Sequence, residues 1–397
     1  MMNFVQPTTA SFTIPATVIS GIGAAEQSGE QARRLGGRSA LVITDPGIAK
    51  LGYADQIVKQ LHSVDIGATI FSDVTPDPTL QNVKDGLKQY HESGCDFIVS
   101  IGGGSAIDCG KAIGVKLTND GELAEYMGVD KIPNPGVPLI AIPTTAGTGS
   151  ECTKVTVITD TERNVKMMLS SPCLLAQVAL IDPLLSVTTP PHLTSAVGVD
   201  ALTHAIEAYI SKRAQPITNA LALQAIRLIS DSLRQAWSDA ENIEARTAMM
   251  IGASIAGMAF SNSSVALVHG MSRPIGAYFH VHHGLSNAVL LLDVMEFSLV
   301  GAPARFADIA RAMGEPIEGL SPMHQADAAI GAVERLINDV QMPRLGEIGI
   351  DPSKFEAAVE PMASDALASG SPANNPRQST QQEIVALYRK CFAPREA

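Results

Sequence analysis

Aromatic and basic residues are scarce in this sequence of 397 residues. Aromatic side chains make up 4% of it, too few for a platform that stacks the bases of single-stranded nucleic acid. The 28 lysines and arginines are outnumbered by 40 aspartates and glutamates, which gives a formal net charge of −12. Because nucleic-acid-binding proteins normally display a basic face, we expect no nucleic-acid partner.

Cysteine is also sparse. The five cysteines form an odd number and no CxxC pair; they are Cys95, Cys109, Cys152, Cys173 and Cys391. This pattern argues against a disulfide framework and against a cysteine zinc site, and it favours a reducing compartment. The first ten residues, MMNFVQPTTA, lack the basic and apolar regions of a signal peptide. We therefore expect a cytoplasmic protein.

Long hydrophobic runs are missing as well. The most apolar helical stretch, TAMMIGASIAGMAF at residues 247–260, is too short to span a bilayer and predicts a buried core helix. We expect no membrane partner. Hydrophobic residues nevertheless make up 46% of the chain and charged residues only 17%, which supplies a large core and excludes general disorder. The length favours about two domains.

The first half alternates between short apolar runs and helix-like segments. Strands are expected at residues 39–45, 69–74, 97–101 and 139–142, with helices at 24–35, 54–62, 80–91 and 105–117. Two more strand-like pieces follow at 154–159 and 178–181. This alternation predicts βαβ units in an α/β domain, with a Rossmann-like parallel sheet buried on both faces.

The second half has a different composition. From about residue 184 the chain is rich in Ala, Leu, Ile and Met at helical spacing, and Pro190-Pro191 suits a helix start. We predict an α/β domain over residues 1–185 and an all-helical domain over residues 186–397. A loop at 370–376 precedes a last helix at 381–391.

A glycine turn follows the third expected strand. Gly102, Gly103, Gly104 and Ser105 open a helix there. Glycines let the backbone approach a phosphate closely, and a helix N-terminus offers N–H groups to an anion, so the turn could hold a pyrophosphate. A tight strand-to-helix turn is an equally good interpretation. The order differs from the GxGxxG fingerprint, because the acidic candidate Asp45 precedes the glycines.

Asp45 ends the first expected strand. A carboxylate there can accept hydrogen bonds from an adenosine ribose and would repel a 2′-phosphate, which favours NAD over NADP. Its position in the sequence TDPG also suits an ordinary type I turn. A second turn, PTTAGTGSE at residues 143–151, carries hydroxyls at Thr144, Thr145 and Thr148 that could wrap a phosphate or a ribose. Alternatively it is only a flexible loop.

Histidine placement is the most informative feature of the helical half. Asp200 and His204 lie four residues apart, so on a helix both point from one face. His269 lies in an apolar stretch, and His283 follows in the sequence HVHHG, where His280 and His282 are alternative ligands. One carboxylate and three imidazoles could bind a divalent transition metal. An Asp/His pair is often a surface pair, however, and a lone histidine on an apolar face is more often a core residue.

Such a metal site has a chemical use. A divalent ion keeps positive charge after one aspartate has bound, and that charge stabilises an alkoxide oxygen. An alkoxide is a good hydride donor to a nicotinamide ring, in which case the metal supplies electrostatics and the cofactor supplies the redox chemistry.

Four motifs, in this order, give the chain a family resemblance. GGGSAIDCGKAIG (102–114), PTTAGTGSE (143–151), GVDALTHAIEAY (198–209) and HGMSRPIGAYFHVHHG (269–284) together resemble the iron-containing, group III alcohol dehydrogenases. The resemblance runs from about residue 10 to residue 390. It implies a dinucleotide-binding α/β domain, a helical domain and an active site in the cleft between them.

The resemblance also assigns residues. The metal ligands would be Asp200, His204, His269 and His283, the last chosen over His282 because it directly precedes the glycine. Asp45 would contact the ribose, the turn Gly102, Gly103, Gly104 and Ser105 the pyrophosphate, and Asp108 the nicotinamide ribose side. Further cofactor contacts would come from Thr144, Thr145, Thr148, Val157, Lys166 and Leu185.

Two departures from the family pattern stand out. Many members have a histidine where this chain has Arg273, and arginine cannot act as a base near neutral pH. A proton would then leave by another route, such as water or His280. Arg273 could hold an anionic group of the substrate, or it could pair with a neighbouring carboxylate or line the cofactor cleft. Asp77 stands where relatives often have asparagine, which alters the expected adenine-side pocket.

We therefore expect a metal-dependent, NAD(H)-linked alcohol dehydrogenase or aldehyde reductase that moves hydride between a metal-bound alkoxide and nicotinamide C4. The metal would be Fe²⁺, with Zn²⁺ also suited to the ligand set. One alternative is the same scaffold acting on a charged substrate, such as 4-hydroxybutyrate, a sulfonated or phosphonated aldehyde, or maleylacetate; another is a nucleotide-binding protein whose catalytic site has decayed. The family suggests a homodimer or larger homo-oligomer, with residues 12–18 a candidate for pairing across subunits.

Overall fold

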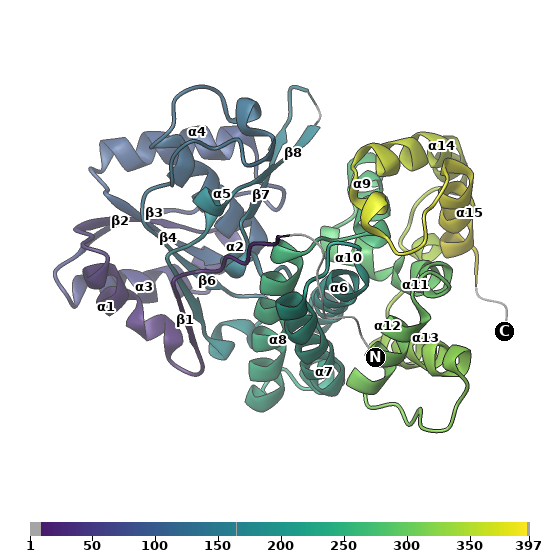
Figure 1. Ribbon diagram of the computed structural model, residues 1–397. Helices are drawn as coiled ribbons and strands as arrows, with labels where there is room; N and C mark the ends of the chain where they lie inside the picture. Colours follow the sequence, from purple (N-terminus) through teal and green to yellow (C-terminus); the bar gives the residue numbers. More distant parts are fainter. Residues whose placement is uncertain (1–8, 164, 395–397) are drawn as a thin grey trace. The chain divides into compact units, whose positions relative to one another are not determined.

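The chain divides into two compact units. The computed structural model describes residues 9–163 and 165–394 (Figure 1). One unit comprises residues 13–188, and the other includes residues 9–12 and 189–394. The sequence-based boundary at 185/186 stays a prediction. Residues 9–12 group with the helical unit instead of the α/β unit, and Gln215 Nε2 donates a hydrogen bond to the Ser11 carbonyl at 3.0 Å.

The α/β unit is built on a six-stranded parallel sheet. Its order is β1-β9-β6-β4-β2-β3, and every neighbouring pair is parallel. The strands are β1 (Thr17–Ser20), β2 (Ser39–Ile43), β3 (Gly67–Phe71), β4 (Phe97–Gly102), β6 (Leu139–Pro143) and β9 (Val178–Ile181). The predicted parallel α/β domain is thus confirmed. β1 shares its first two residues with the segment proposed for pairing across subunits, and here it pairs with β9 of the same chain.

Helices cover both faces of this sheet (Figure 1). They are α1 (Ser28–Arg34), α2 (Pro46–Lys50), α3 (Tyr53–His62), α4 (Leu80–Glu92) and α5 (Gly104–Lys116). Because strand side chains alternate between faces, Leu41 and Ile43 join the core shared with α4 and α5, while Ala40 and Val42 join the core shared with α1 and α3. Burial on both sides explains why the strands read as continuous apolar runs.

A small second sheet belongs to the same unit. Its order is β5-β8-β7, with β5 (Gly128–Val129), β7 (Val155–Asp160) and β8 (Val165–Ser170). β7 and β8 are antiparallel, and Thr159 lies opposite Lys166. Short 3₁₀ helices lie at Ala24–Gln27, Leu123–Tyr126, Ser150–Cys152, Pro172–Leu174 and Pro183–Ser186.

The strand order reverses beside β2. The chain runs from β2 outward to β3 and then returns to the other side of β2 as β4. The carboxyl ends of β2 and β4 are therefore neighbours at a switch point, which is where open α/β sheets bind ligands. Asp45 follows β2 and the glycine turn follows β4, so the fold brings these two predicted elements together.

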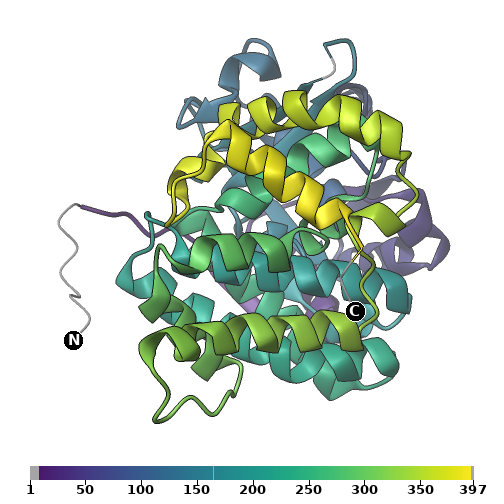
Figure 2. The ribbon, with the colours of Figure 1, turned by 90° about the vertical axis from the view of Figure 1, so that its right-hand side faces the viewer.

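The other unit is helical, as predicted, and Figure 2 looks onto it. Its helices are α6 (Pro191–Ile210), α7 (Pro216–Ser238), α8 (Ile243–Asn262), α9 (Leu267–Phe279), α10 (His283–Ala288), α11 (Leu291–Leu299), α12 (Pro303–Ala312), α13 (Pro322–Asp339), α14 (Pro352–Ala368) and α15 (Gln381–Phe392). Two 3₁₀ helices lie at Leu345–Glu347 and Ser371–Asn374. α6 is buried along almost its whole length, and its buried residues include Asp200, His204 and Glu207 as well as apolar side chains. The helical unit thus has α6 at its centre.

The helices also answer the question of membrane spans. Among the residues that the structure describes, no single helix has the length and hydropathy to cross a bilayer; α8 and α9 meet both conditions only when taken together as a pair bent by 102°.

Candidate functional site

The four predicted metal ligands lie together in the helical unit. Their ligand atoms are all within 4.8 Å of one another. α6 supplies Asp200 and His204, α9 supplies His269, and His283 is the first residue of α10. His282, the neighbour that the sequence left as an alternative, is the N-cap residue of α10 and lies outside this group.

α6 positions two of these ligands from within the core. Their spacing of four residues puts Asp200 and His204 on one face of the helix, and their exposed fractions are 1% and 4%. The imidazole of His204 stacks on the ring of Phe260, with centroids 4.3 Å apart and planes 17° from parallel. The stacked ring shields one face of the imidazole from water and limits its rotation.

The nitrogen atoms of the cluster point at one another. His269 Nε2 lies 3.0 Å from His204 Nε2 and 3.8 Å from Asp200 Oδ1. Burial lowers the pKa of His269 to about 4, although the nearby Asp200 opposes this effect. A neutral imidazole at pH 7 keeps a lone pair, which is the form that binds a metal ion.

Glu207 contacts His269 at Nδ1, the ring nitrogen that does not face His204. The sequence analysis did not predict this contact. Glu207 Oε2 lies 2.6 Å from His269 Nδ1, and Glu207 Oε1 accepts a hydrogen bond from Val268 N at 2.6 Å. Burial raises the pKa of Glu207 to about 7, while hydrogen bonds from backbone N–H groups act in the opposite direction. A proton on His269 Nδ1 would bond to this carboxylate and leave Nε2 free for an ion. The available signal was its place on α6, three residues after His204.

Asn287 touches the cluster from the other side, and it too was missed. It lies on α10, four residues after His283 and therefore on the same face. Asn287 Nδ2 is 2.7 Å from Asp200 Oδ1, 3.1 Å from His269 Nε2 and 3.2 Å from His283 Nε2. Its Oδ1 atom is buried and has no hydrogen-bond partner among the described residues. Its amide thus faces three of the four ligands at once.

These donors fit a divalent transition metal. Three imidazole nitrogens and one carboxylate oxygen are the ligand types that such ions prefer. The Nε2 atoms of His204 and His269 lie 3.0 Å apart, beside the buried carboxylate of Asp200. Histidines that only fill a core do not need ring nitrogens this close together. A cation at this point would satisfy lone pairs that the protein alone leaves facing one another.

Arg273 lies four residues after His269 on α9. Its Nη1 donates a hydrogen bond to Ser371 Oγ at 3.0 Å. Burial lowers the pKa of Arg273, and the charge of Glu207 opposes this shift. The guanidinium therefore has partners within the protein. His280, the other residue considered for proton transfer, ends α9 in a left-handed conformation with φ 55°.

The predicted nucleotide contacts lie in the α/β unit. Gly102 has φ +152°, and a Cβ there would lie 2.8 Å from the Ala106 Cβ, so the turn from β4 into α5 requires glycine. α5 begins at Gly104 with Gly103 as its N-cap residue and no side-chain cap. Its first N–H groups are thus available to an anion. The Ser105 hydroxyl donates to the Pro76 carbonyl.

Asp45 caps α2 and lies beside the glycine turn. Its Oδ1 accepts hydrogen bonds from Gly47 N at 2.8 Å and Ile48 N at 3.1 Å, so it caps α2. This is the local turn role that the sequence left open. Its Oδ2 would lie 3.4 Å from a Cβ on Gly102, which places the second oxygen beside the glycine turn.

The hydroxyl-rich turn packs on the glycine turn. Thr144 N donates to the Gly102 carbonyl at 3.0 Å, and the Thr144 hydroxyl is buried with no hydrogen-bond partner in the described residues. A Cβ on Gly103 would meet the Thr145 hydroxyl at 3.7 Å, and one on Gly104 would collide with the Thr148 methyl at 2.9 Å. The close approach at Gly104 favours glycine, whereas the distance at Gly103 is an ordinary van der Waals contact. The buried Thr144 hydroxyl could bond to a nucleotide.

Four other predicted cofactor contacts have partners within the protein. Asp108 Oδ2 accepts a hydrogen bond from Val157 N at 2.9 Å. Lys166 Nζ donates to Asp77 Oδ1 at 2.8 Å, so the unusual aspartate pairs with the predicted cofactor lysine. Leu185 is buried in the core on the α1 and α3 face. None of these contacts tests the proposed roles of these residues.

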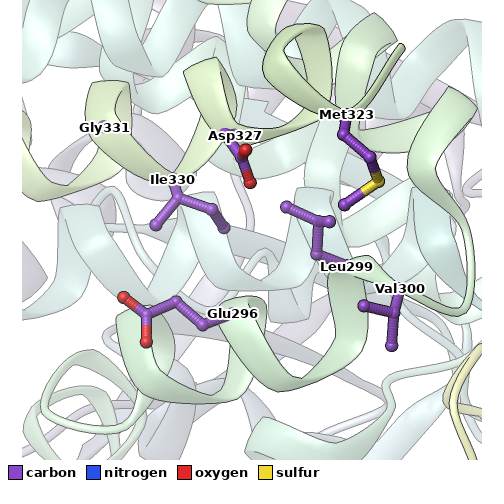
Figure 3. A pocket seen from close by; sticks show the side chains of 7 residues that line it. All are labelled: Glu296, Leu299, Val300, Met323, Asp327, Ile330 and Gly331. Carbon is purple, nitrogen blue, oxygen red and sulfur yellow. The ribbon is translucent and has the colours of Figure 1, made fainter.

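The helical unit also contains a hollow of about 370 Å³ (Figure 3). Residues from α11 and α13 line it, together with Val300; they are Glu296, Leu299, Val300, Met323, Asp327, Ile330 and Gly331. Its lining is mainly apolar, with a carboxylate on each of the two helices. It contains none of the predicted site residues, and we assign it no role in the chemistry.

Comparison with known proteins extends over nearly the whole chain. Residues 15–183 match the family described as iron-containing alcohol dehydrogenase, and residues 194–392 match the C-terminal part of the Fe-containing alcohol dehydrogenase family. A 1,3-propanediol dehydrogenase of Klebsiella pneumoniae is 43% identical over 384 residues, covering 96% of this chain and 98% of that protein. An NAD-dependent methanol dehydrogenase of Bacillus methanolicus is 39% identical over 383 residues, with 96% and 100% covered. The crystal structure of a 1,3-propanediol oxidoreductase superposes with a TM-score of 0.94 at 43% identity, covering 97% of this chain and all of that one.

Proposed function

Because this chain belongs to the iron-containing alcohol dehydrogenase family, we propose that it interconverts a small neutral alcohol and its aldehyde, with NAD(H) as hydride carrier and a divalent metal ion held by four side chains. The family is one of oxidoreductases that act on alcohols. The metal, the cofactor and the substrate class are our proposals. The observation that carries the metal proposal is the convergence of Asp200, His204, His269 and His283.

The ligand set supports a transition metal without choosing one. The family description favours Fe²⁺, but one oxygen and three nitrogens also suit Zn²⁺, and affinities generally increase from Fe²⁺ toward Cu²⁺. A divalent ion there would supply positive charge that stabilises negative charge on the substrate oxygen.

The protein's own residues would prepare that site. Glu207 would hold the proton of His269 on Nδ1, which presents Nε2 to the ion. Asn287 would hold Asp200 Oδ1 toward the imidazoles through its 2.7 Å contact. Phe260, stacked on His204, would keep water from that face of the site. Each of these residues acts through a ligand and does not touch the substrate.

The cofactor proposal rests on the α/β unit. The N-terminus of α5 would receive the pyrophosphate, and the second oxygen of Asp45 would accept hydrogen bonds from a ribose. A carboxylate in that position disfavours a 2′-phosphate, which supports NAD over NADP. The relative from Bacillus methanolicus is an NAD-dependent methanol dehydrogenase, which agrees with this choice.

The substrate proposal rests on Arg273 and on the relatives. The Arg273 guanidinium already donates a hydrogen bond to Ser371 within the helical unit. It is therefore less suited to clamping an anionic substrate. The relatives named for 1,3-propanediol and methanol also act on neutral alcohols. We propose short primary alcohols and diols.

The direct test combines metal analysis with turnover. Protein prepared without oxygen should carry about one Fe²⁺ or Zn²⁺ per chain and should reduce NAD with 1,3-propanediol, ethanol or methanol faster than with 4-hydroxybutyrate. The variant His283→Ala should lose bound metal and at least about a hundredfold in kcat/KM, since one ligand is removed. His282→Ala is the matched control, because it removes the neighbouring imidazole outside the cluster, and it should keep both properties.

Other results would reject parts of this proposal. Faster turnover of 4-hydroxybutyrate than of neutral alcohols would favour the charged-substrate alternative. Protein without metal and without turnover would favour a decayed site. A homo-oligomeric state and a cytoplasmic location stay predictions; sedimentation and cell fractionation would measure them.

A further inference from the structure

The hollow lined by α11 and α13 has features of a ligand site that the proposed chemistry does not use. Its volume of about 370 Å³ lies at the lower end of the range for pockets that hold small molecules. Residues at i, i+3 and i+4 of the α11 segment and at i, i+4, i+7 and i+8 of α13 line it, so each helix presents one face to it. The lining combines apolar side chains with two carboxylates, which points to a ligand with an apolar body and a positive charge.

We propose that this hollow binds a small organic cation with a single positive charge and a short alkyl body, such as an alkylammonium ion. The site lies wholly within the helical unit and contains none of the predicted metal ligands or nucleotide contacts. The inference therefore goes beyond the proposed function and does not depend on it.

Apolar side chains form one side of the hollow and extend to its exposed rim. Leu299 is buried, whereas Val300 and Met323 have exposed fractions of 58% and 43%. Figure 3 shows these three side chains together on one side of the hollow, with Glu296 on the other. An alkyl chain seated against them would remove apolar surface of the ligand and of the protein from water, which favours binding.

The charges at the hollow leave one carboxylate unbalanced. Lys390 Nζ pairs with Glu296 Oε2 and lies 3.3 Å from Asp293 Oδ1. Arg344 Nη2 lies 3.3 Å from Asp293 Oδ2, so two basic residues balance these two carboxylates. Asp327, on the opposite helix, has no ion-pair partner among the residues that the structure describes. One unbalanced negative charge beside an apolar wall complements a monovalent cation and disfavours an anion.

Gly331 provides room in the hollow from within α13. A glycine inside a helix destabilises the helix relative to alanine, so its presence there has a cost. The nearest atom that a Cβ on Gly331 would meet outside the helix backbone is Arg335 Nη1 at 3.3 Å. That atom is the end of a flexible side chain, which pairs with Glu315 through its other terminal nitrogen. The surrounding fold therefore does not require glycine, and the space that it leaves is available to a ligand.

The test is a titration of the full-length, metal-loaded protein with n-pentylammonium chloride at constant ionic strength, followed by NMR of ¹³C-labelled methionine methyl groups. The Met323 resonance, assigned by its absence in Met323→Leu, should move with a Kd of about 1–10 mM, since each buried CH₂ group improves affinity by up to about fourfold. n-Propylammonium should bind about fourfold or more weakly than n-pentylammonium. Pentanoate, which has a similar length and the opposite charge, should leave the resonance in place. The resonance of Met271, two residues from His269 on α9, should not move, which separates this site from the metal cluster.

Two variants change the hollow in different ways. Asp327→Asn removes the unbalanced charge and keeps the shape, and it should raise the Kd for n-pentylammonium by about threefold. Asp339→Asn is the matched control, because it removes a carboxylate from the same helix outside the hollow, and its Kd should not change. Gly331→Leu fills the hollow and should abolish the movement of the Met323 resonance. Metal content should stay within about twofold of the unsubstituted protein in all three variants.

Several results would overturn the inference. They are equal affinities of Asp327→Asn and Asp339→Asn, a folded Gly331→Leu that still binds n-pentylammonium, and a Met323 resonance that responds to pentanoate as it does to the cation or to neither. Because Asp327 is exposed, its variant should fold, and the test does not depend on Gly331→Leu. A protein that binds the cation but turns over no alcohol would reject the proposed function and leave this inference in place.

Discussion

At the scale of single residues, buried polar side chains decide how the candidate site is built. The two positions that flank the metal cluster are Glu207 and Asn287, and each contacts a proposed ligand at 2.6–2.7 Å. Neither touches the substrate in our proposal. Their importance lies in holding a ligand in one orientation, which is a property that can be measured as metal affinity.

Replacement of Glu207 should loosen the metal without unfolding the helix. In Glu207→Gln the amide can no longer accept both the Val268 N–H and the His269 Nδ1–H, so His269 loses its fixed orientation. We expect the Kd for Zn²⁺ to rise by about 10- to 100-fold, measured by competition with a chromophoric chelator. Glu244→Gln, at an exposed position in the first turn of α8, is the control and should bind Zn²⁺ normally. Equal affinities for the two variants would contradict the role given to Glu207.

Lys111, a lysine on α5 with an exposed fraction of 2%, should alter how the free energy of unfolding depends on pH. Burial lowers its pKa from 10.5 to about 8, against the effect of Asp108 and Glu151. Between pH 8 and 10.5 the unfolded chain therefore binds more protons at this residue than the folded chain, and the free energy of unfolding rises with pH by up to about 3 kcal/mol. Urea unfolding of the unsubstituted protein and of Lys111→Met should give a stability difference that grows over this range. Parallel pH profiles would show that Lys111 keeps an ordinary pKa.

The residues found from the sequence and those missed differ in what their roles depend on. Asp200 and His204 could be paired because both lie on one helix, where spacing predicts a shared face. Glu207, Asn287 and Lys111 act on groups from other elements, and such contacts depend on packing that spacing does not report. A lysine is also almost always exposed, so no pattern in the sequence predicted that Lys111 lies in the core.

At the scale of elements, local pattern was sufficient to place the start of several strands and helices of the α/β unit. β2, β4, β6, β9, α4 and α5 begin within about one residue of the predicted positions. The segment expected as one helix over residues 24–35 is a 3₁₀ helix followed by α1. β1, β5 and β8 were not predicted, because each exists through pairing with a neighbour; β8 pairs with both β5 and β7.

The turn from β4 into α5 permits a test at this scale. Gly102→Ala places a methyl group 2.8 Å from the Ala106 Cβ in addition to the unfavourable φ of +152°. Gly94→Ala is a matched control, because Gly94 also has a positive φ but has open space around its Cβ position. We expect Gly102→Ala to lower the free energy of unfolding by about 1–3 kcal/mol more than Gly94→Ala and to weaken NADH binding. Urea unfolding and fluorescence titration would measure both; equal losses of stability would contradict the steric argument.

At the scale of the whole molecule, the two proposed ligands belong to different units. Every predicted nucleotide contact lies within residues 13–188, and every predicted metal ligand lies within residues 189–394. The family match likewise has an N-terminal and a C-terminal part. Hydride transfer needs the nicotinamide ring and the substrate oxygen to meet. The resemblance implies a cleft in which they would do so, and that cleft stays a prediction.

Removal of the metal should therefore affect one unit more than the other. A ligand present at 100 to 1,000 times its Kd stabilises the folded state by about 3–4 kcal/mol, so we expect chelation to lower the Tm of the helical unit by roughly 5–15 °C. NADH affinity of the chelated protein should change by less than about threefold. Calorimetry and fluorescence titration with and without chelator would show this. Loss of NADH binding together with the metal would mean that the two sites are coupled.

The short helix α10 has a consequence for how the protein is loaded. It has six residues, far fewer than an isolated helix needs to persist in water, yet it carries both His283 and Asn287. An ion bound by His283 together with the ligands on α6 and α9 would hold this short helix in place. Binding of the ion and folding of this segment would then be coupled. A stored preparation that loses its ion would unfold first at α10.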